Sequence, residues 1–151
     1  MYKNILKNIR LEQEITQTII AKKIGISRGR YSQYETEIDI MPIKHLYIIC
    51  KYLNVSLDYL FEFSKTNNYT KINRLEIDKI KSGIRIKEFR KSKHITQKEL
   101  ANILNTVQPV IAKYEKGINT IATPFLYDIC RKYNISADYL IGITDNPKIL
   151  K

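Results

Sequence analysis

The chain has 151 residues, of which 44% are hydrophobic and 27% charged, which excludes an intrinsically disordered tail. Its five glycines and four prolines are too few for a turn-rich all-β protein, and no apolar run reaches the ~20 residues of a membrane span. A formal net charge of +11 favours an anionic partner, either nucleic acid or an anionic membrane surface, although a basic surface also serves solubility alone. The N-terminus lacks the apolar core and cleavage site of a signal peptide, so we expect a cytoplasmic protein.

The first sixty residues have apolar side chains at intervals of three and four positions, which predicts a series of short helices. Thr16 and Ser27 each precede a helical pattern, where a hydroxyl oxygen can accept a hydrogen bond from the first turn. Gly25 suits the left-handed turn that ends a helix. The expected helices are Tyr2–Glu12, Gln17–Ile24, Arg28–Tyr34, Ile43–Leu53 and a fifth from Ser56 to Phe61.

A polar segment without apolar periodicity follows at Ser64–Asn73, and we interpret it as a linker. From Arg74 onward the sequence RLEIDKIKSGIRIKEFRK is again typical of a helix. The first helix of this second part is therefore expected to be longer than Tyr2–Glu12.

The second part of the chain repeats the first. Residues 84–143 align with residues 4–63 at a fixed shift of eighty without a gap, and 18 of the 60 pairs are identical. The phrase ITQKELA at Ile95–Ala101, for example, repeats ITQTIIA at Ile15–Ala21. The chain is therefore two copies of one module of about sixty residues, the size of a small domain.

Helix-end signals recur in the second copy. Thr96 and Glu99 have the spacing of a capping box, in which each side chain bonds the other residue's backbone. Asn105 takes the place of Gly25 after the second helix, and asparagine also tolerates the left-handed turn. Thr123-Pro124 predicts an N-cap followed by proline at the first helical position.

Two short helices joined by a tight turn are the plan of a helix-turn-helix motif. The pattern TQxxxA, then Gly or Asn, then a capped helix ending in YE resembles the lambda-repressor-like (Cro/cI-type) family. The closest matches are GIRIKEFRKSKHITQKELA at Gly83–Ala101 and YEKG at Tyr114–Gly117. VSLDYL at Val55–Leu60 and ISADYL at Ile135–Leu140 resemble the family's last helix.

The resemblance covers both modules and implies an all-α fold of two tandem five-helix DNA-binding domains. We expect the domains at residues 1–63 and 74–145, joined by the linker at 64–73 and followed by a tail at 146–151.

The resemblance assigns the third helix of each module to the major groove and the start of the second helix to a DNA phosphate. Gln17 and Gln97 occupy this phosphate position. Arginine suits guanine and glutamine suits adenine, each through paired hydrogen bonds. The expected outward positions are Ser27, Arg28, Gly29, Ser32 and Gln33 in the first module and Val107, Gln108, Pro109, Ala112 and Lys113 in the second, with Arg30 and Lys116 near phosphates.

Two charge pairs resemble the family's internal ion pair, which ties the first helix to the end of the third. They are Arg10 with Glu35 and Arg90 with Glu115. We expect both pairs to stabilise the fold and not to catalyse, since no nucleophile, second carboxylate or histidine accompanies them.

The two modules depart from the family pattern in different ways. In the first, Glu37 stands where the family has glycine, and Asp39 adds a second negative charge near the expected phosphates. In the second, the recognition helix is largely apolar and begins with Val107. Residues 1–63 carry a net charge of +2 and residues 84–143 carry +5, so the second module is expected to be the stronger electrostatic anchor and the first the better base reader.

Nothing in the sequence resembles a phosphate loop, a nucleophile elbow or a pair of catalytic acids, so we predict no enzymatic activity, no cofactor and no metal site. His45 and His94 are isolated from other metal-ligating residue types. Cys50 and Cys130 occupy equivalent positions in the two copies and are expected to be small core residues.

We therefore expect a sequence-specific transcriptional regulator, a repressor of bacterial, phage or mobile-element type that binds double-stranded DNA and no membrane. The alternative is a protein-interaction module, such as an antirepressor or antitoxin, that retains the fold but binds a partner regulator. The acidic loop of the first module and the apolar helix of the second favour the alternative, whereas the net charge, Arg28 and Gln33 oppose it. Whether the chain also forms a homodimer stays open, because a tandem pair can replace dimerisation or add to it.

Overall fold

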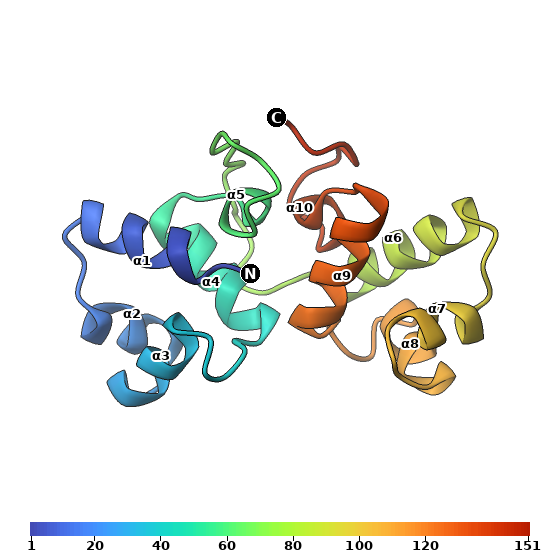
Figure 1. Ribbon diagram of the computed structural model, residues 1–151, viewed down its shortest axis with the longest axis horizontal. Helices are drawn as coiled ribbons and strands as arrows, with labels where there is room; N and C mark the ends of the chain where they lie inside the picture. Colours follow the sequence, from blue (N-terminus) through green and yellow to red (C-terminus); the bar gives the residue numbers. More distant parts are fainter. The chain divides into compact units, whose positions relative to one another are not determined.

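The computed structural model describes residues 1–151 as ten helices in two compact units, with no strand (Figure 1). Unit 1 comprises Met1–Glu76 together with Ile149–Lys151, and unit 2 comprises Ile77–Lys148. Each unit has five helices, which confirms the all-α fold of two five-helix domains predicted from the sequence.

Helices of unit 1 follow the sequence pattern closely. Thr16 and Ser27 cap α2 and α3, since their hydroxyl oxygens accept hydrogen bonds from the amides of Ile19 and Arg30 at 3.2 and 3.1 Å. Gly25 ends α2 with a left-handed φ of 74°. The helices are α1 Lys3–Glu12, α2 Gln17–Ile24, α3 Arg28–Glu35, α4 Ile43–Leu53 and α5 Leu57–Leu60.

Unit 2 repeats this order, with two corrections at helix starts. The first helix does not begin at Arg74 but at Lys79, because the Asp78 carboxylate caps it by accepting from the amide of Lys81 at 3.0 Å. Thr123 is the first helical residue of its helix and not the N-cap, which is Ala122. The helices are α6 Lys79–Ser92, α7 Gln97–Ile103, α8 Gln108–Glu115, α9 Thr123–Tyr133 and α10 Ala137–Leu140.

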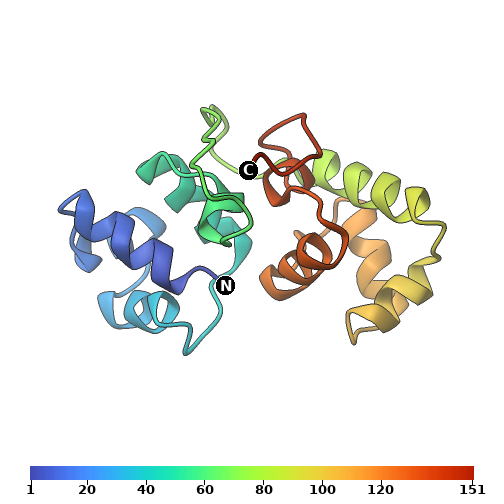
Figure 2. The ribbon, with the colours of Figure 1, turned by 45° about the horizontal axis from the view of Figure 1, so that its top comes forward.

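Each unit has its own apolar core, built from equivalent positions of the two copies. Fully buried side chains come from every helix, and α2 packs on α3 as α7 packs on α8 (Figures 1 and 2). Ala21 and Ala101, which are 2% and 1% exposed, leave room for this close helix crossing. The equivalent core pairs include Leu6 and Ile86, Ile20 and Leu100, Tyr31 and Ile111, Leu46 and Leu126, and Cys50 and Cys130.

The polar segment predicted as a linker is held on unit 1 by hydrogen bonds. The Asn67 side chain accepts from the amide of Ser56 and donates to the carbonyl of Asn54, both at 2.9 Å. Further along, the carbonyl of Arg74 accepts from Tyr47 and from Lys51 at 3.3 Å. The segment interpreted as a linker is therefore anchored along the surface of unit 1.

The two units differ most at the start of their first helices. Helix α6 begins one turn earlier than α1 relative to the repeat, and this added turn brings Ile80 against Gly117. Gly117 has a left-handed φ of 71°, and a Cβ atom on it would lie 2.7 Å from Ile80 Cδ1 and 3.0 Å from Ile80 Cα, so glycine is favoured there. In unit 1 the equivalent residue is Glu37, whose carboxylate instead accepts hydrogen bonds from the amides of Tyr2 and Lys3 at 2.6 and 3.0 Å. A glutamate thus caps α1 at the place where α6 gains a turn.

Candidate nucleic-acid interface

A buried polar network fixes the helix pair of each unit. In unit 1 the Arg10 guanidinium donates to the Glu35 carboxylate at 2.9–3.2 Å and to the carbonyl of Ile15 at 2.8 Å. Gln17, at the start of α2, donates its amide to the same carboxylate at 3.2 Å. Because Arg10 and Glu35 are 7% and 2% exposed, the network links α1, α2 and the end of α3 inside the unit.

Unit 2 contains the same network and extends it. Arg90 donates to Glu115 at 2.5 and 3.2 Å, and Gln97 donates to Glu115 at 2.7 Å. The hydrogen bonds from Glu115 raise the pKa of the Arg90 guanidinium above its ordinary value. The Gln97 side-chain oxygen then accepts from Gln108, the first residue of α8, at 2.6 Å. The side chain of Gln108 is therefore anchored to the fold at one end.

Helix α3 divides into an inner and an outer face. Tyr31 and Tyr34 are buried on the inner face. The residues expected to face DNA lie on the other side of the helix, where Ser32 is half-buried and Ser27, Arg28, Gly29, Arg30 and Gln33 are exposed. This outward surface therefore combines two arginines, one glutamine and two hydroxyl groups.

Helix α8 has the same division with different chemistry. Ile111 and Tyr114 are buried beneath it. On the outer side Ala112 is half-buried and Val107, Gln108, Pro109 and Lys113 are exposed, with Lys116 exposed just after the helix. This surface is more apolar than that of α3 and has a single polar, uncharged side chain, Gln108.

The acidic residues after α3 are both paired within unit 1. The Glu37 carboxylate binds the start of α1, and Asp39 forms an ion pair with Arg30 at 3.0 Å. Partial burial alone would raise the pKa of the Glu37 carboxyl, but hydrogen bonds from the N-terminal amine and from the amides of Tyr2 and Lys3 together lower it. These two charges therefore do not form the unpaired acidic surface that their sequence suggested.

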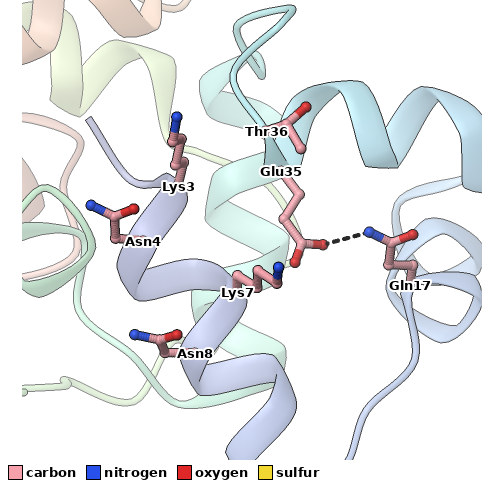
Figure 3. A pocket seen from close by; sticks show the side chains of 7 residues that line it. All are labelled: Lys3, Asn4, Lys7, Asn8, Gln17, Glu35 and Thr36. Carbon is pink, nitrogen blue, oxygen red and sulfur yellow. Dashed lines mark hydrogen bonds between the residues drawn. The ribbon is translucent and has the colours of Figure 1, made fainter.

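A hollow of about 380 Å³ opens beside the Arg10–Glu35 network (Figure 3). Lys3, Asn4, Lys7 and Asn8 of α1 line it, together with Gln17, Glu35 and Thr36. Sequence reasoning did not assign these α1 residues to the site. Their spacing of one helical turn, Lys3 to Lys7 and Asn4 to Asn8, was the available signal.

Positive charge is shared almost equally by the two units. Unit 1 with its three tail residues has thirteen Lys or Arg against eight Asp or Glu, and unit 2 has thirteen against seven. The net charges of +5 for unit 1 and +6 for unit 2 differ less than the +2 of residues 1–63 and the +5 of residues 84–143. The reason is that the segment before α6 and the chain end add basic residues to unit 1. Neither unit is a distinctly stronger electrostatic anchor.

None of the ten helices is long and apolar enough to cross a membrane. No group of three or more His, Cys, Asp or Glu side chains is arranged to hold a metal ion.

Comparison with protein families gives a match to the family described as Helix-turn-helix, which the chain contains twice, at residues 6–60 and 86–140. No solved structure matches the chain.

Curated relatives match over a single module's length. The uncharacterised HTH-type transcriptional regulator YobD of Bacillus subtilis is 35% identical over 60 residues, which are 40% of this chain and 54% of that protein. The HTH-type transcriptional regulator ImmR of the same organism is 38% identical over 60 residues, covering 40% and 47% of the two chains. The antitoxin PezA of Streptococcus pneumoniae is 33% identical over 60 residues, covering 40% and 38%. The match thus spans about half the length of the curated relatives or less.

Proposed function

Because the chain belongs to the helix-turn-helix family of Cro/cI-type transcriptional regulators, we propose that it is a repressor that binds double-stranded DNA sequence-specifically through α3 and α8. This family is non-enzymatic, in agreement with the sequence, which offers no catalytic constellation. The proposal is carried by one observation: in each unit a buried Arg–Glu–Gln network holds a short helix whose outer face is free.

In unit 1 the base-reading side chains are Arg28 and Gln33. The Arg28 guanidinium has the paired donors that match guanine O6 and N7, and the Gln33 amide matches adenine N6 and N7. Ser27 and Ser32 add hydroxyl groups that bond either type of base. Gly29 has no side chain and lies in open space, with nothing within 4 Å of where a Cβ atom would stand, so it keeps the outer face of α3 low and lets the DNA approach closely.

Phosphate contacts come from both ends of the helix pair. The N-termini of α2 and α7, at Gln17 and Gln97, offer backbone amides to a phosphate. Lys3 and Lys7 line the hollow beside Gln17, with Lys7 pointing toward Glu35, and add two positive charges (Figure 3). In unit 2, Lys116 just after α8 and Lys113 within α8 supply positive charges for the phosphates.

A second candidate function is a protein-interaction module of the antirepressor or antitoxin type. The similarity to the antitoxin PezA and the apolar outer face of α8 favour it. The internal pairing of Glu37 and Asp39 removes its other support, because these carboxylates are already engaged within unit 1. We therefore rank DNA binding first.

The experiment is a selection of bound sequences from random duplexes, followed by a salt titration with the full chain. We expect a defined consensus, and a logarithm of affinity that falls linearly with the logarithm of salt concentration, with a slope of about −0.9 for each phosphate contact. Random duplexes should bind with the same sign of slope but about 10³-fold or more weakly. A chain that selects no consensus and shows no salt dependence contradicts the proposal and favours the protein-interaction function.

A further inference from the structure

The N-terminus of α8 differs from that of α3 in two respects. Val107 is the N-cap residue and makes no capping hydrogen bond, whereas the equivalent Ser27 caps α3. Val107 is also 61% exposed, although it is apolar. A valine at this position offers no side-chain acceptor, so the Val110 amide donates to the Val107 backbone carbonyl at 3.1 Å instead. The valine also places two methyl groups in solvent, so neither side-chain capping nor solubility accounts for it.

Further apolar groups surround the same point. Pro109 is exposed in the first turn of α8, and Ala112 is half-buried one turn further along the same face. The equivalent residues of α3 are Gly29 and Ser32, so the apolar surface is specific to unit 2. The N-terminal residues of a recognition helix are the ones that reach base edges in the major groove.

Gln108 lies within this apolar surface with a fixed orientation. One hydrogen of its amide nitrogen is donated to Gln97, which Glu115 and Arg90 hold in turn. A glutamine amide has two donor hydrogens and one acceptor oxygen, so one donor and the oxygen stay available for another partner. That pair matches N7 and N6 of adenine.

We propose, on the basis of the function proposed above, that unit 2 reads A·T base pairs: Gln108 binds an adenine, and Val107, Pro109 and Ala112 contact the C5 methyl groups of neighbouring thymines. The thymine methyl is the one apolar group that base pairs present in the major groove, which makes it the matching partner for an apolar helix face. Unit 1, with Arg28 in place of Gln108 and no apolar outer side chain near it, reads a G·C-containing half-site instead. The protein therefore recognises an asymmetric site in which one half is defined by methyl groups.

The test uses the full chain and a duplex from the selection, in which each thymine is replaced in turn by uracil, which lacks only the methyl group. The half-site of unit 2 is identified as the one whose preference relaxes in Gln108→Ala, and that of unit 1 as the one that relaxes in Arg28→Ala. In the half-site of unit 2 we expect each contacted methyl group to contribute about fourfold in affinity, or ~0.8 kcal/mol, and two such groups about 15-fold. Uracil in the half-site of unit 1 serves as the control and should change affinity less than twofold.

Val107→Ser supplies a matched variant, because serine at the equivalent position of unit 1 caps its helix and the substitution is therefore expected to fold. This variant should lose the sensitivity to uracil at one thymine position and keep it at the others. Sequence-specific binding that is insensitive to uracil in the half-site of unit 2, or a Val107→Ser variant as sensitive as the original, overturns this inference and leaves the proposed function intact. Failure of the full chain to select any sequence overturns the proposed function as well.

Discussion

Glu37 occupies a backbone position that glycine fills in unit 2, with φ at 58° against 71° for Gly117. A non-glycine residue in this left-handed region carries a conformational cost of about 1–2 kcal/mol. The carboxylate offsets that cost by accepting hydrogen bonds from two amides at the start of α1. The same position of the repeat therefore supports the start of the first helix in two ways. In unit 2 glycine adopts the left-handed backbone and leaves space for α6, and in unit 1 the glutamate side chain caps α1.

Glu37→Ala is expected to lower the free energy of unfolding of unit 1 by about 1.5–3 kcal/mol, since it removes charged hydrogen bonds and keeps the strained backbone. Glu37→Gly should cost less by about 1 kcal/mol, because glycine relieves the left-handed strain. Urea unfolding of the two variants measures the difference. Equal losses in both variants would show that the backbone at this position is not strained.

The lowered pKa of Glu37 gives this cap a pH dependence. A carboxyl whose pKa is lower in the folded protein stabilises the fold above its unfolded pKa of about 4.3, and the stabilisation is lost as pH falls through the folded pKa. Unfolding measured between pH 7 and pH 3 should therefore show a smaller loss of stability on acidification in Glu37→Ala than in the original chain. Parallel pH profiles would contradict the assignment.

The buried and exposed ion pairs provide a second comparison at single residues. Glu115→Ala leaves Arg90 buried without its carboxylate and should lower the free energy of unfolding of unit 2 by about 3–5 kcal/mol. Asp39→Ala breaks the pair with Arg30, whose two side chains are 51% and 46% exposed, and should cost less than about 1 kcal/mol. Thermal unfolding separates the two cases. If Glu115→Ala unfolds like the original chain yet loses DNA binding, Glu115 belongs to the interface and not to the fold.

Gly83 lies where α6 crosses α8, and Gly29 of α3 provides a comparison in open space. A Cβ on Gly83 would lie 2.4 Å from the carbonyl oxygen of Tyr114, so Gly83→Ala should destabilise unit 2 by about 1–3 kcal/mol although alanine is the better helix former. Gly29 of α3 has open space around it, so Gly29→Ala should stabilise unit 1 by about 0.5–1 kcal/mol. Unfolding of both variants is the measurement. The same sign for both would mean that helix propensity and not the close crossing decides.

Much of the helix pattern was predictable, because capping residues such as Thr16, Ser27 and Thr96 act within three positions along the chain. The start of α6 was misplaced because apolar residues continue upstream of Asp78, yet Leu75 among them is 82% exposed and faces no core. For the interface, the outward positions of α3 and α8 were assigned by the resemblance to the Cro/cI-type family. The structure has them exposed or half-buried, and their contact with DNA stays a prediction. The pairing of Glu37 with Tyr2 was not predictable, since the two residues are 35 positions apart and meet only in the folded unit.

For the whole molecule, the presence of two recognition helices, α3 and α8, in one chain predicts that the covalent linkage of the two units increases the affinity for DNA. Residues 1–76 and 77–151, expressed separately, divide the chain between Glu76 and Ile77, so that only Ile149–Lys151 of unit 1 stay on the second fragment. The division keeps the Arg74 carbonyl with its partners in unit 1. Each fragment should bind the selected duplex about 10²–10⁴-fold more weakly than the full chain, because the second binding event is no longer intramolecular.

Salt dependence provides an independent measure of the same mechanism. Each unit neutralises its own set of phosphates, so the salt slopes of the two fragments should add up to the slope of the full chain. Their net charges of +4 for residues 1–76 and +7 for residues 77–151 make both slopes negative and comparable in size. Each fragment should also protect only its own half of the asymmetric site in a footprint. If one fragment alone reproduces the affinity, slope and footprint of the full chain, the other unit does not read DNA, and the protein-interaction function applies to that unit.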